Sequence, residues 1–194
     1  MATGAEIVAT AEAELGSTNW YKYLHFCGYD FKTDWCAAFV TWVFGQYGLN
    51  RIAVPHTINC TPGRQWFIDR GRYETDKSTY TPVPGDVIYY HWSTGTEGKV
   101  QHVGIVRYVD QDYVYTVEGN VNFINGVSRV AYKKRTRLYS SIDGYGRPYL
   151  DNAVPDPVGD PELPDGNPYD PPDEYKKWYQ YGSSFKWWLY GRRK

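Results

Sequence analysis

One segment of the 194-residue sequence, 35–47, is apolar around almost its whole circumference when it is drawn as a helix. Such a helix is stable only when other elements cover it on several sides, so the fold must enclose it. Gly48 follows directly and can end it. Residues 5–15 form a second predicted helix with one apolar face, and 62–70 form a shorter one. The polar and aromatic segment 17–34 is predicted to be a loop.

The sequence pattern changes from helical to strand-like after about residue 85. Segments 86–90, 103–109 and 113–118 are rich in β-branched and aromatic residues and are separated by turn residues, which is typical of strands. Segments 127–132 and 144–150 are candidates for further strands. Helices first and strands afterwards predict an α+β fold, in which N-terminal helices pack on one face of an antiparallel β-sheet.

Composition divides the chain into three parts. The length fits one domain of about 150 residues with an appendage, and we expect that domain to occupy residues 1–150. Residues 151–174 hold seven prolines, eight acidic residues and no basic one, which predicts an extended linker. Residues 175–194 form a basic, aromatic tail. Either this tail binds an anionic polymer or a membrane surface, or it folds back on the domain or the acidic linker.

The net charge and the N-terminal residues indicate which partners and which cellular location to expect. The net charge is −1, so there is no general basic field for nucleic acid. The N-terminus lacks the charged and apolar regions of a secretory signal, and no stretch approaches the roughly 20 apolar residues of a membrane span. We therefore expect a protein that is made in the cytoplasm, and that another agent releases or delivers if it acts outside a cell. We also expect it to be a monomer.

Cys36 stands where a polar approach ends and the buried helix begins. A helix N-terminus carries partial positive charge and free N–H groups, which favour a thiolate and can hold an oxyanion. Taken alone, a free cysteine is more often a small buried apolar residue. Cys27 and Cys60 are either bridged or buried and reduced, and we favour the second. No Cys/His cluster has the spacing of a structural zinc site.

A base for such a thiolate stands at the head of a predicted strand. His102 directly precedes segment 103–109. A cysteine nucleophile needs a base, and the imidazole needs an orienting partner on its other nitrogen. Glu118 and Asn120 end the next predicted strand and, being two residues apart, face the same side. If the two strands pair, a carboxylate and an amide lie beside the imidazole.

In combination these residues resemble the CHAP domain, the cysteine- and histidine-dependent amidohydrolase/peptidase family related to NlpC/P60 and papain. The order and spacing fit over about residues 5–150. The motifs that carry the resemblance are Trp35-Cys36-Ala37-Ala38-Phe39-Val40, Pro84-Gly85-Asp86-Val87-Ile88, His102-Val103-Gly104-Ile105-Val106, Glu118-Gly119-Asn120 and Gly144-Tyr145-Gly146-Arg147-Pro148.

The resemblance implies a papain-like fold and hydrolysis of an amide bond in bacterial peptidoglycan. The bond is either the N-acetylmuramoyl–L-alanine link or one within the stem or cross-bridge peptide. By resemblance, Cys36 is the nucleophile and His102 the general base and then acid. Glu118 orients His102, and Asn120 assists as a polar partner. A phage endolysin is the expected setting, with a tail-associated lysin or a contact-delivered toxin as alternatives.

The resemblance implies no cofactor. Some CHAP domains bind calcium through an aspartate-rich loop ahead of the cysteine. Here that region offers Asp30 and Asp34 but no dense Asp-x-Asp cluster, so we expect no metal.

Three residues near these motifs are candidates for substrate contacts, namely Trp35, Trp92 and Gln101. Trp35 either forms the floor of the cleft or fills the core. Two other functions stay open at this point. One is a non-catalytic wall-binding module on a CHAP scaffold, and the other is an amidase or acyltransferase that acts on a soluble peptide conjugate.

Two other histidines compete with His102 for the role of the base. His56 lies in a loop without a strand-borne carboxylate partner, whereas His91 follows a strand and could line the cleft. Asp86 follows Pro-Gly at the start of a strand, so we expect it to serve the turn rather than catalysis.

Overall fold

A computed structural model describes residues 2–92 and 99–151, which contain four helices and six strands. The helices are α1 (Gly4–Glu12), α2 (Trp20–Phe26), α3 (Cys36–Gly45) and α4 (Cys60–Ile68). The strands are β1 (Tyr73–Glu74), β2 (Val87–Tyr90), β3 (His102–Val109), β4 (Tyr113–Ile124), β5 (Val127–Thr136) and β6 (Ile142–Gly146). None of these helices has the length and apolar character needed to cross a bilayer. The predicted tail and all but the first residue of the predicted linker lie outside the described residues.

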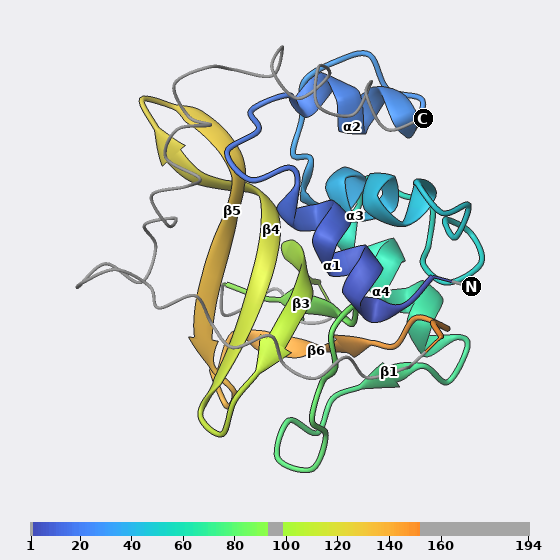
Figure 1. Cartoon of the computed structure of the whole chain (residues 1–194), viewed down its shortest axis with the longest axis vertical. Helices are drawn as coiled ribbons and strands as arrows, with labels where there is room; N and C mark the ends of the chain where they lie inside the picture. The colour runs from blue at the N-terminus through green and yellow to red at the C-terminus, as the bar shows by residue number, and fades with distance from the viewer. Residues whose placement is uncertain (1, 93–98, 152–194) are drawn as a thin grey trace.

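The six strands form one sheet in the order β1-β6-β2-β3-β4-β5, and every neighbouring pair is antiparallel. Figure 1 shows β4 and β5 as long, twisted strands beside the shorter β3. β3 pairs with β4, with Ile105 opposite Val117. The predicted α+β class is confirmed, and so is the strand pairing on which the predicted site depends.

The helices gather on one side of the sheet, where α1 and α3 cross β3 and β4 (Figure 1). Val103, Ile105 and Val117 point from the sheet into the main core that these helices complete. Gly119 in β4 allows α3 to come close, because a Cβ there would lie 2.7 Å from the Cβ of Phe39. This close approach sets the start of α3 against the β3–β4 pair.

A second, smaller apolar cluster lies apart from the main core. It consists of Ile88, Tyr90, Val106, Val114, Ile142 and Tyr145. Because side chains alternate along a strand, residues of β3 and β4 that point away from the helices point towards this cluster. The ring of Tyr90 stacks on that of His102, with 5.7 Å between centroids. His102 therefore sits at the boundary of this second cluster.

The predicted loop 17–34 is wrong in part, because it contains α2. The side chain of Asn19 caps this helix by accepting a hydrogen bond from the N–H of Lys22 at 3.2 Å. α1 begins with a capping box between Thr3 and Glu6. It ends at Glu12, three residues before the predicted end.

Candidate active site

Cys36 is the first residue of α3 and is 3% exposed. No side chain caps this helix, because Trp35 occupies the N-cap position without such a bond. The free N–H groups of the first turn are therefore available to a group at the helix start. The backbone N–H of Ala37 already donates to the Cys36 sulfur. The N-terminus of α3 thus stabilises negative charge at this sulfur.

His102 begins β3 and makes two hydrogen bonds that define the site. Its Nε2 lies 2.8 Å from Oε2 of Glu118. The ring also hydrogen-bonds to the thiol of Cys36. Because Nε2 is engaged by the carboxylate, Nδ1 is the nitrogen that is left for the sulfur. The imidazole therefore bridges the nucleophile and a carboxylate.

Glu118 is fully buried and is held on both oxygens. The hydroxyl of Tyr90 donates to Oε1 at 2.9 Å, and the hydroxyl of Thr116 donates to the same oxygen at 2.6 Å. Space for this carboxylate comes from Gly104 on the neighbouring strand, since a Cβ there would lie 2.6 Å from Cγ of Glu118. Only a residue without a side chain leaves the carboxylate in this place.

The charges of these three groups support one another. Burial alone would lower the pKa of His102, but its bonds to Cys36 and Glu118 raise it to about 10. Burial alone would raise the pKa of Glu118, but the charge and hydrogen bond of His102, helped by Arg135, lower it to about 2. At neutral pH the arrangement is therefore a thiolate, an imidazolium and a carboxylate in sequence.

Cys60 lies beside Cys36, and nothing in the sequence indicated this contact. It begins α4, and its sulfur lies 3.5 Å from that of Cys36. The thiol of Cys60 donates to the Cys36 sulfur, and this bond is the main reason that the pKa of Cys36 is well below its usual value, with His102 adding to the effect. The same bond, together with burial, raises the pKa of Cys60. Cys27 and Cys60 are both free thiols, as predicted.

Asn120 does not share the direction of Glu118. The pairing of β4 with β5 shifts register between Glu118 and Val121, and Asn120 has a left-handed backbone with φ of 62°. This irregularity breaks the alternation on which the expected common direction rested. The amide of Asn120 donates to Asp34 at 3.0 Å, so it ties β4 to the chain that leads to Cys36.

The three predicted substrate contacts lie in different environments. Trp35 is 1% exposed, stacks on Tyr23 with 5.2 Å between centroids and fills the core. Trp92 is 46% exposed and lies 6.0 Å from the ring of His102. Gln101 accepts a hydrogen bond from the backbone of Trp92 at 2.9 Å. Trp92 and Gln101 are therefore both exposed beside the site, whereas Trp35 is not.

The structure separates His102 from its competitors. His56 hydrogen-bonds to Asn50, and Nδ1 of His91 lies 3.6 Å from Asp143. Asp86 is buried and accepts hydrogen bonds from the hydroxyl of Tyr80 and the backbone of Val83. It holds the turn before β2, as expected, and burial raises its pKa to about 6.

The aspartates considered for calcium bind other side chains. Asp30 accepts from the hydroxyl of Tyr21 and pairs with His25, while Asp34 accepts from Asn120. Within residues 2–92 and 99–151, no group of three or more His, Cys, Asp or Glu side chains is arranged to hold a metal ion.

The residues of this site fall within a range that matches a known family model. Residues 28–120 match the family model described as the CHAP domain. This range contains Cys36, His102 and Glu118 and ends at Asn120. The match supports a CHAP domain in this part of the chain.

Individual relatives are more distant. No curated protein matches the chain. Two similar solved structures are described as "The crystal structure of Ly7917" and "The crystal structure of Ly7917 with the hydrolyzing product of MDP". Each is 15% identical with a TM-score of 0.48, and the alignment covers 75% of this chain. The chain spans 62% of the length of those structures.

Proposed function

We propose that this protein is a peptidoglycan hydrolase that cleaves an amide bond with Cys36 as the nucleophile. The observation that carries the proposal is the continuous hydrogen-bonded series of Cys36, His102 and Glu118 at the N-terminus of α3. Each group in this series has the protonation state that acyl transfer requires. The match to the CHAP domain supports peptidoglycan as the substrate.

In the first half of the reaction, the Cys36 thiolate attacks the carbonyl carbon of the amide. The carbonyl oxygen becomes an oxyanion, which the free N–H groups at the start of α3 can receive. His102 then gives its Nδ1 proton to the departing nitrogen. The C–N bond breaks, the amine leaves, and a thioester joins the acyl group to Cys36.

In the second half, the now neutral His102 takes a proton from a water molecule. The hydroxide attacks the thioester carbon, the C–S bond breaks, and the carboxylic acid leaves. Cys36 returns to the thiolate and His102 to the imidazolium. Glu118 stays ionised throughout, because it holds the Nε2 side of the ring and offsets its positive charge.

The test is digestion of purified peptidoglycan by the wild-type protein and by Cys36→Ala, with the fragments identified by mass. We expect the wild type to release fragments and Cys36→Ala to release none above background. His56→Ala is the matched control, because His56 lies away from Cys36 and should keep its activity. Equal release by wild type and Cys36→Ala would refute the cysteine mechanism. Wall binding without release by the wild type would favour the non-catalytic module.

The same fragments identify the bond. A muramoyl-L-alanine amidase frees the α-amino group of L-alanine, whereas an endopeptidase frees an amino group further along the stem or cross-bridge. We propose that the cut is one of these two.

The biological setting that we propose is a phage endolysin whose tail, residues 175–194, binds the wall. The basic and aromatic composition of the tail supports this role. Truncation after residue 160 tests it. Unchanged binding to cell walls by the truncated protein would contradict a binding role for the tail.

A further inference from the structure

An aromatic surface leads away from the catalytic histidine. The indole of Trp92 stacks on Tyr90 with 5.0 Å between centroids and 10° between planes. Tyr90 in turn stacks on His102 and hydrogen-bonds to Glu118. Because Trp92 is 46% exposed, it forms an open wall beside the reacting groups. A substrate at Cys36 would extend along this wall.

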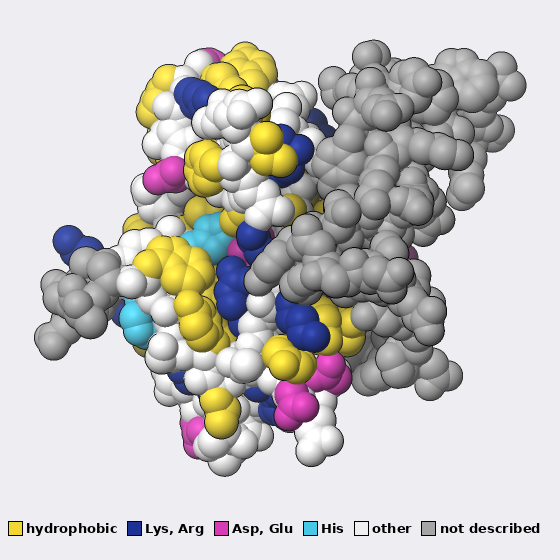
Figure 2. Space-filling model, turned by 90° about the vertical axis from the view of Figure 1, so that its left-hand side faces the viewer, with side chains coloured by type: hydrophobic (Ala, Val, Ile, Leu, Met, Phe, Trp, Pro, Cys, Tyr) yellow, Lys and Arg dark blue, Asp and Glu magenta, His cyan; other side chains and the backbone are white. Residues whose placement is uncertain are grey.

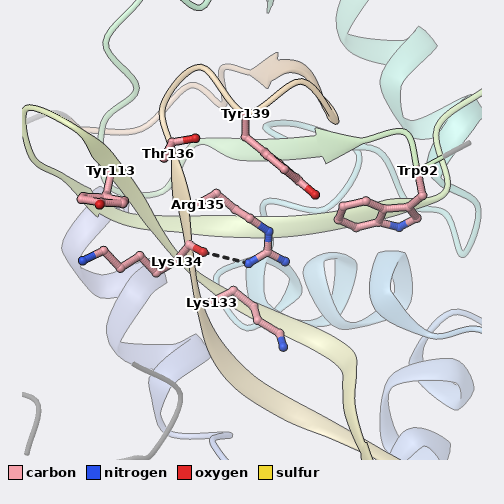
Figure 3. A pocket seen from close by; sticks show the side chains of 7 residues that line it. All are labelled: Trp92, Tyr113, Lys133, Lys134, Arg135, Thr136 and Tyr139. Atoms are coloured by element: carbon pink, nitrogen blue, oxygen red, sulfur yellow. Dashed lines mark hydrogen bonds between the residues drawn. The ribbon is translucent and has the colours of Figure 1, made fainter. Parts of the chain in front are cut away.

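This wall continues into a basic pocket of about 630 Å³. Its lining residues are Trp92, Tyr113, Lys133, Lys134, Arg135, Thr136 and Tyr139. Figure 3 shows the side chains of Arg135, Lys133 and Tyr139 projecting towards the side on which Trp92 lies. In Figure 2, Lys and Arg side chains lie beside histidine and hydrophobic side chains on this face. Three of the seven lining residues are cationic and none is acidic, so the pocket favours an anion.

Arg135 is held in a fixed place within the pocket. Its guanidinium carbon lies 5.6 Å from the ring centre of Tyr90 and 6.0 Å from that of Trp92. Its Nη1 donates to the backbone carbonyl of Lys134 at 3.1 Å (Figure 3). An arginine that is already positioned loses little freedom when it binds a planar anion. Lys133 is half-buried nearby, hydrogen-bonds to Asn122 and adds a second positive charge.

We propose that this pocket is a substrate subsite that binds a free carboxylate of the peptide, with Arg135 and Lys133 as its anion-binding residues. The proposal rests on the proposed function, because stem peptides of peptidoglycan carry free carboxylates close to their amide bonds. A guanidinium matches a carboxylate through two parallel hydrogen bonds. The aromatic wall of Trp92 connects this subsite to His102, which favours the peptide over a separate wall polymer as the occupant.

The test uses two synthetic stem peptides that differ only in a free carboxylate or the corresponding carboxamide. We expect wild-type protein to have a KM about tenfold lower for the carboxylate peptide. Arg135→Gln should lose this preference in KM, and because Arg135 also lowers the pKa of Glu118, any fall in kcat should be equal for the two peptides. Lys133→Gln should weaken the preference. Arg70→Gln is the control, because Arg70 is exposed just after α4, lies over Trp66 and does not line the pocket, so this variant should keep the preference.

Binding to the Cys36→Ala protein separates this proposal from the proposed function, since it needs no catalysis. Calorimetry should give a dissociation constant about tenfold lower for the carboxylate peptide than for the carboxamide. Equal affinity for the two peptides would overturn the subsite even if peptidoglycan is cleaved. A preference of about tenfold in KM that persists in Arg135→Gln would also overturn it, because Arg135 would then not bind the carboxylate. Stronger binding of a glycerol phosphate oligomer than of the carboxylate peptide would assign the pocket to a phosphate polymer instead.

A second inference rests on a different observation, the distance of 3.5 Å between the sulfurs of Cys36 and Cys60. A disulfide has a sulfur–sulfur distance of about 2.0 Å, so a closure of roughly 1.5 Å would join them. Both residues start helices, and both are buried beside each other. We infer that Cys36 and Cys60 form a reversible disulfide when the protein meets a peroxide.

The chemistry balances in two steps. The Cys36 thiolate attacks one oxygen of hydrogen peroxide, the O–O bond breaks, and a sulfenic acid and hydroxide form. Cys60 then gives up its proton, and its sulfur attacks the sulfenic sulfur and displaces hydroxide. Two thiols and one peroxide thus become one disulfide and two water molecules. The pKa of Cys60 is raised chiefly by its bond to the Cys36 thiolate, and that influence ends once Cys36 is oxidised. A dithiol reductant reverses the reaction.

The test treats the full chain with a small excess of hydrogen peroxide and then with a dithiol. We expect activity to fall by more than tenfold and to return on reduction, with Cys36 and Cys60 peptides linked in a digest. Cys60→Ser, compared with its own untreated activity, should not recover, because its sulfenic acid proceeds to irreversible acids. Cys27→Ser should behave as the wild type. Absence of the linked peptide, or equal recovery by Cys60→Ser, would overturn the inference.

Discussion

Two helices of this molecule, α3 and α4, both begin at a buried cysteine, yet the two thiols have opposite properties. Cys36 and Cys60 each follow an N-cap residue whose side chain makes no capping bond. The pKa of Cys36 is lowered and that of Cys60 is raised. What differs is the neighbour, because His102 approaches Cys36 and the Cys60 thiol itself becomes a donor to Cys36. A helix start alone therefore does not lower the pKa of a cysteine thiol.

The largest expected effect is the contrast between removing each cysteine. Cys36→Ala should lower kcat for peptidoglycan hydrolysis by about 10⁴-fold or more, since the nucleophile is lost. Cys60→Ala should lower it by about tenfold or less, since one hydrogen bond to the thiolate is lost. Release of soluble fragments over time measures both. A loss of similar size in the two variants would mean that the thiols are not distinct in function.

The next largest effect concerns His102, the residue that approaches Cys36 but not Cys60, and the carboxylate of Glu118 that binds it. Glu118→Gln keeps the shape of the side chain but removes its charge, so the imidazolium loses its support. We expect kcat to fall by about 10²- to 10⁴-fold. The alkaline limb of the activity profile, near pH 10 in the wild type, should move to lower pH. Thr116→Val, which removes only one donor to Glu118, should have a much smaller effect. An unmoved alkaline limb in Glu118→Gln would show that Glu118 does not set the charge of His102.

The same pair gives stability a defined pH dependence. The folded pKa of His102, about 10, is above the ordinary 6.5, so its contribution is full below 6.5 and is lost as pH rises through about 10. The folded pKa of Glu118, about 2, is below the ordinary 4.5, so its contribution is full above 4.5 and is lost as pH falls to about 2. We expect the pair to stabilise most between pH 4.5 and 6.5. Denaturant unfolding followed by circular dichroism should show both limbs in the wild type and flatter limbs in Glu118→Gln.

Substitutions at two glycines test the carboxylate side and the helix side of the site separately. Gly104→Ala places a Cβ against Glu118, whereas Gly119→Ala places one against Phe39 under α3. Each should lower the free energy of unfolding by about 1–3 kcal/mol. Only Gly104→Ala should also shift the alkaline limb of activity, because it displaces the carboxylate. Identical pH profiles for the two variants would contradict the role given to Gly104.

The smallest expected effect isolates the bond between the two thiols. Cys60→Ala removes the S–H donor, so the pKa of Cys36 should rise towards its ordinary value. The pH dependence of alkylation by iodoacetamide, with the modified residue identified by mass, measures this change. Cys27→Ala is the control and should leave the profile in place. An unchanged profile in Cys60→Ala would mean that His102 alone sets the charge of Cys36.

Much of the fold follows from the sequence because its patterns are strong and local. The apolar helix predicted over 35–47 is α3, and the strands predicted over 103–109 and 113–118 are β3 and the start of β4. The triad of Cys36, His102 and Glu118 could be assembled because strand pairing brings a histidine at one strand head to a carboxylate near the end of the next. The resemblance to the CHAP domain indicated that these three residues act together.

Other features could not be predicted, for identifiable physical reasons. The candidate strand 127–132 is the first part of β5, but β5 continues to Thr136, and the basic residues at 133–135 gave no sign of this extension. The meeting of Cys60 with Cys36 depends on how α4 packs, and no local pattern encodes that packing. The left-handed backbone at Asn120 turned its side chain towards Asp34, because a register shift broke an alternation that the sequence shows as regular.

The single hairpin that carries both His102 and Glu118 has a consequence for the order of events during synthesis. These two residues are separated by 16 positions, so their pairing closes a short loop and can form early in folding. Cys36 is translated well before either of them, but its thiol keeps an ordinary pKa until the hairpin docks against α3. A nascent or misfolded chain therefore exposes a cysteine that is mostly protonated at neutral pH, and we expect the thiolate to predominate only in the folded domain.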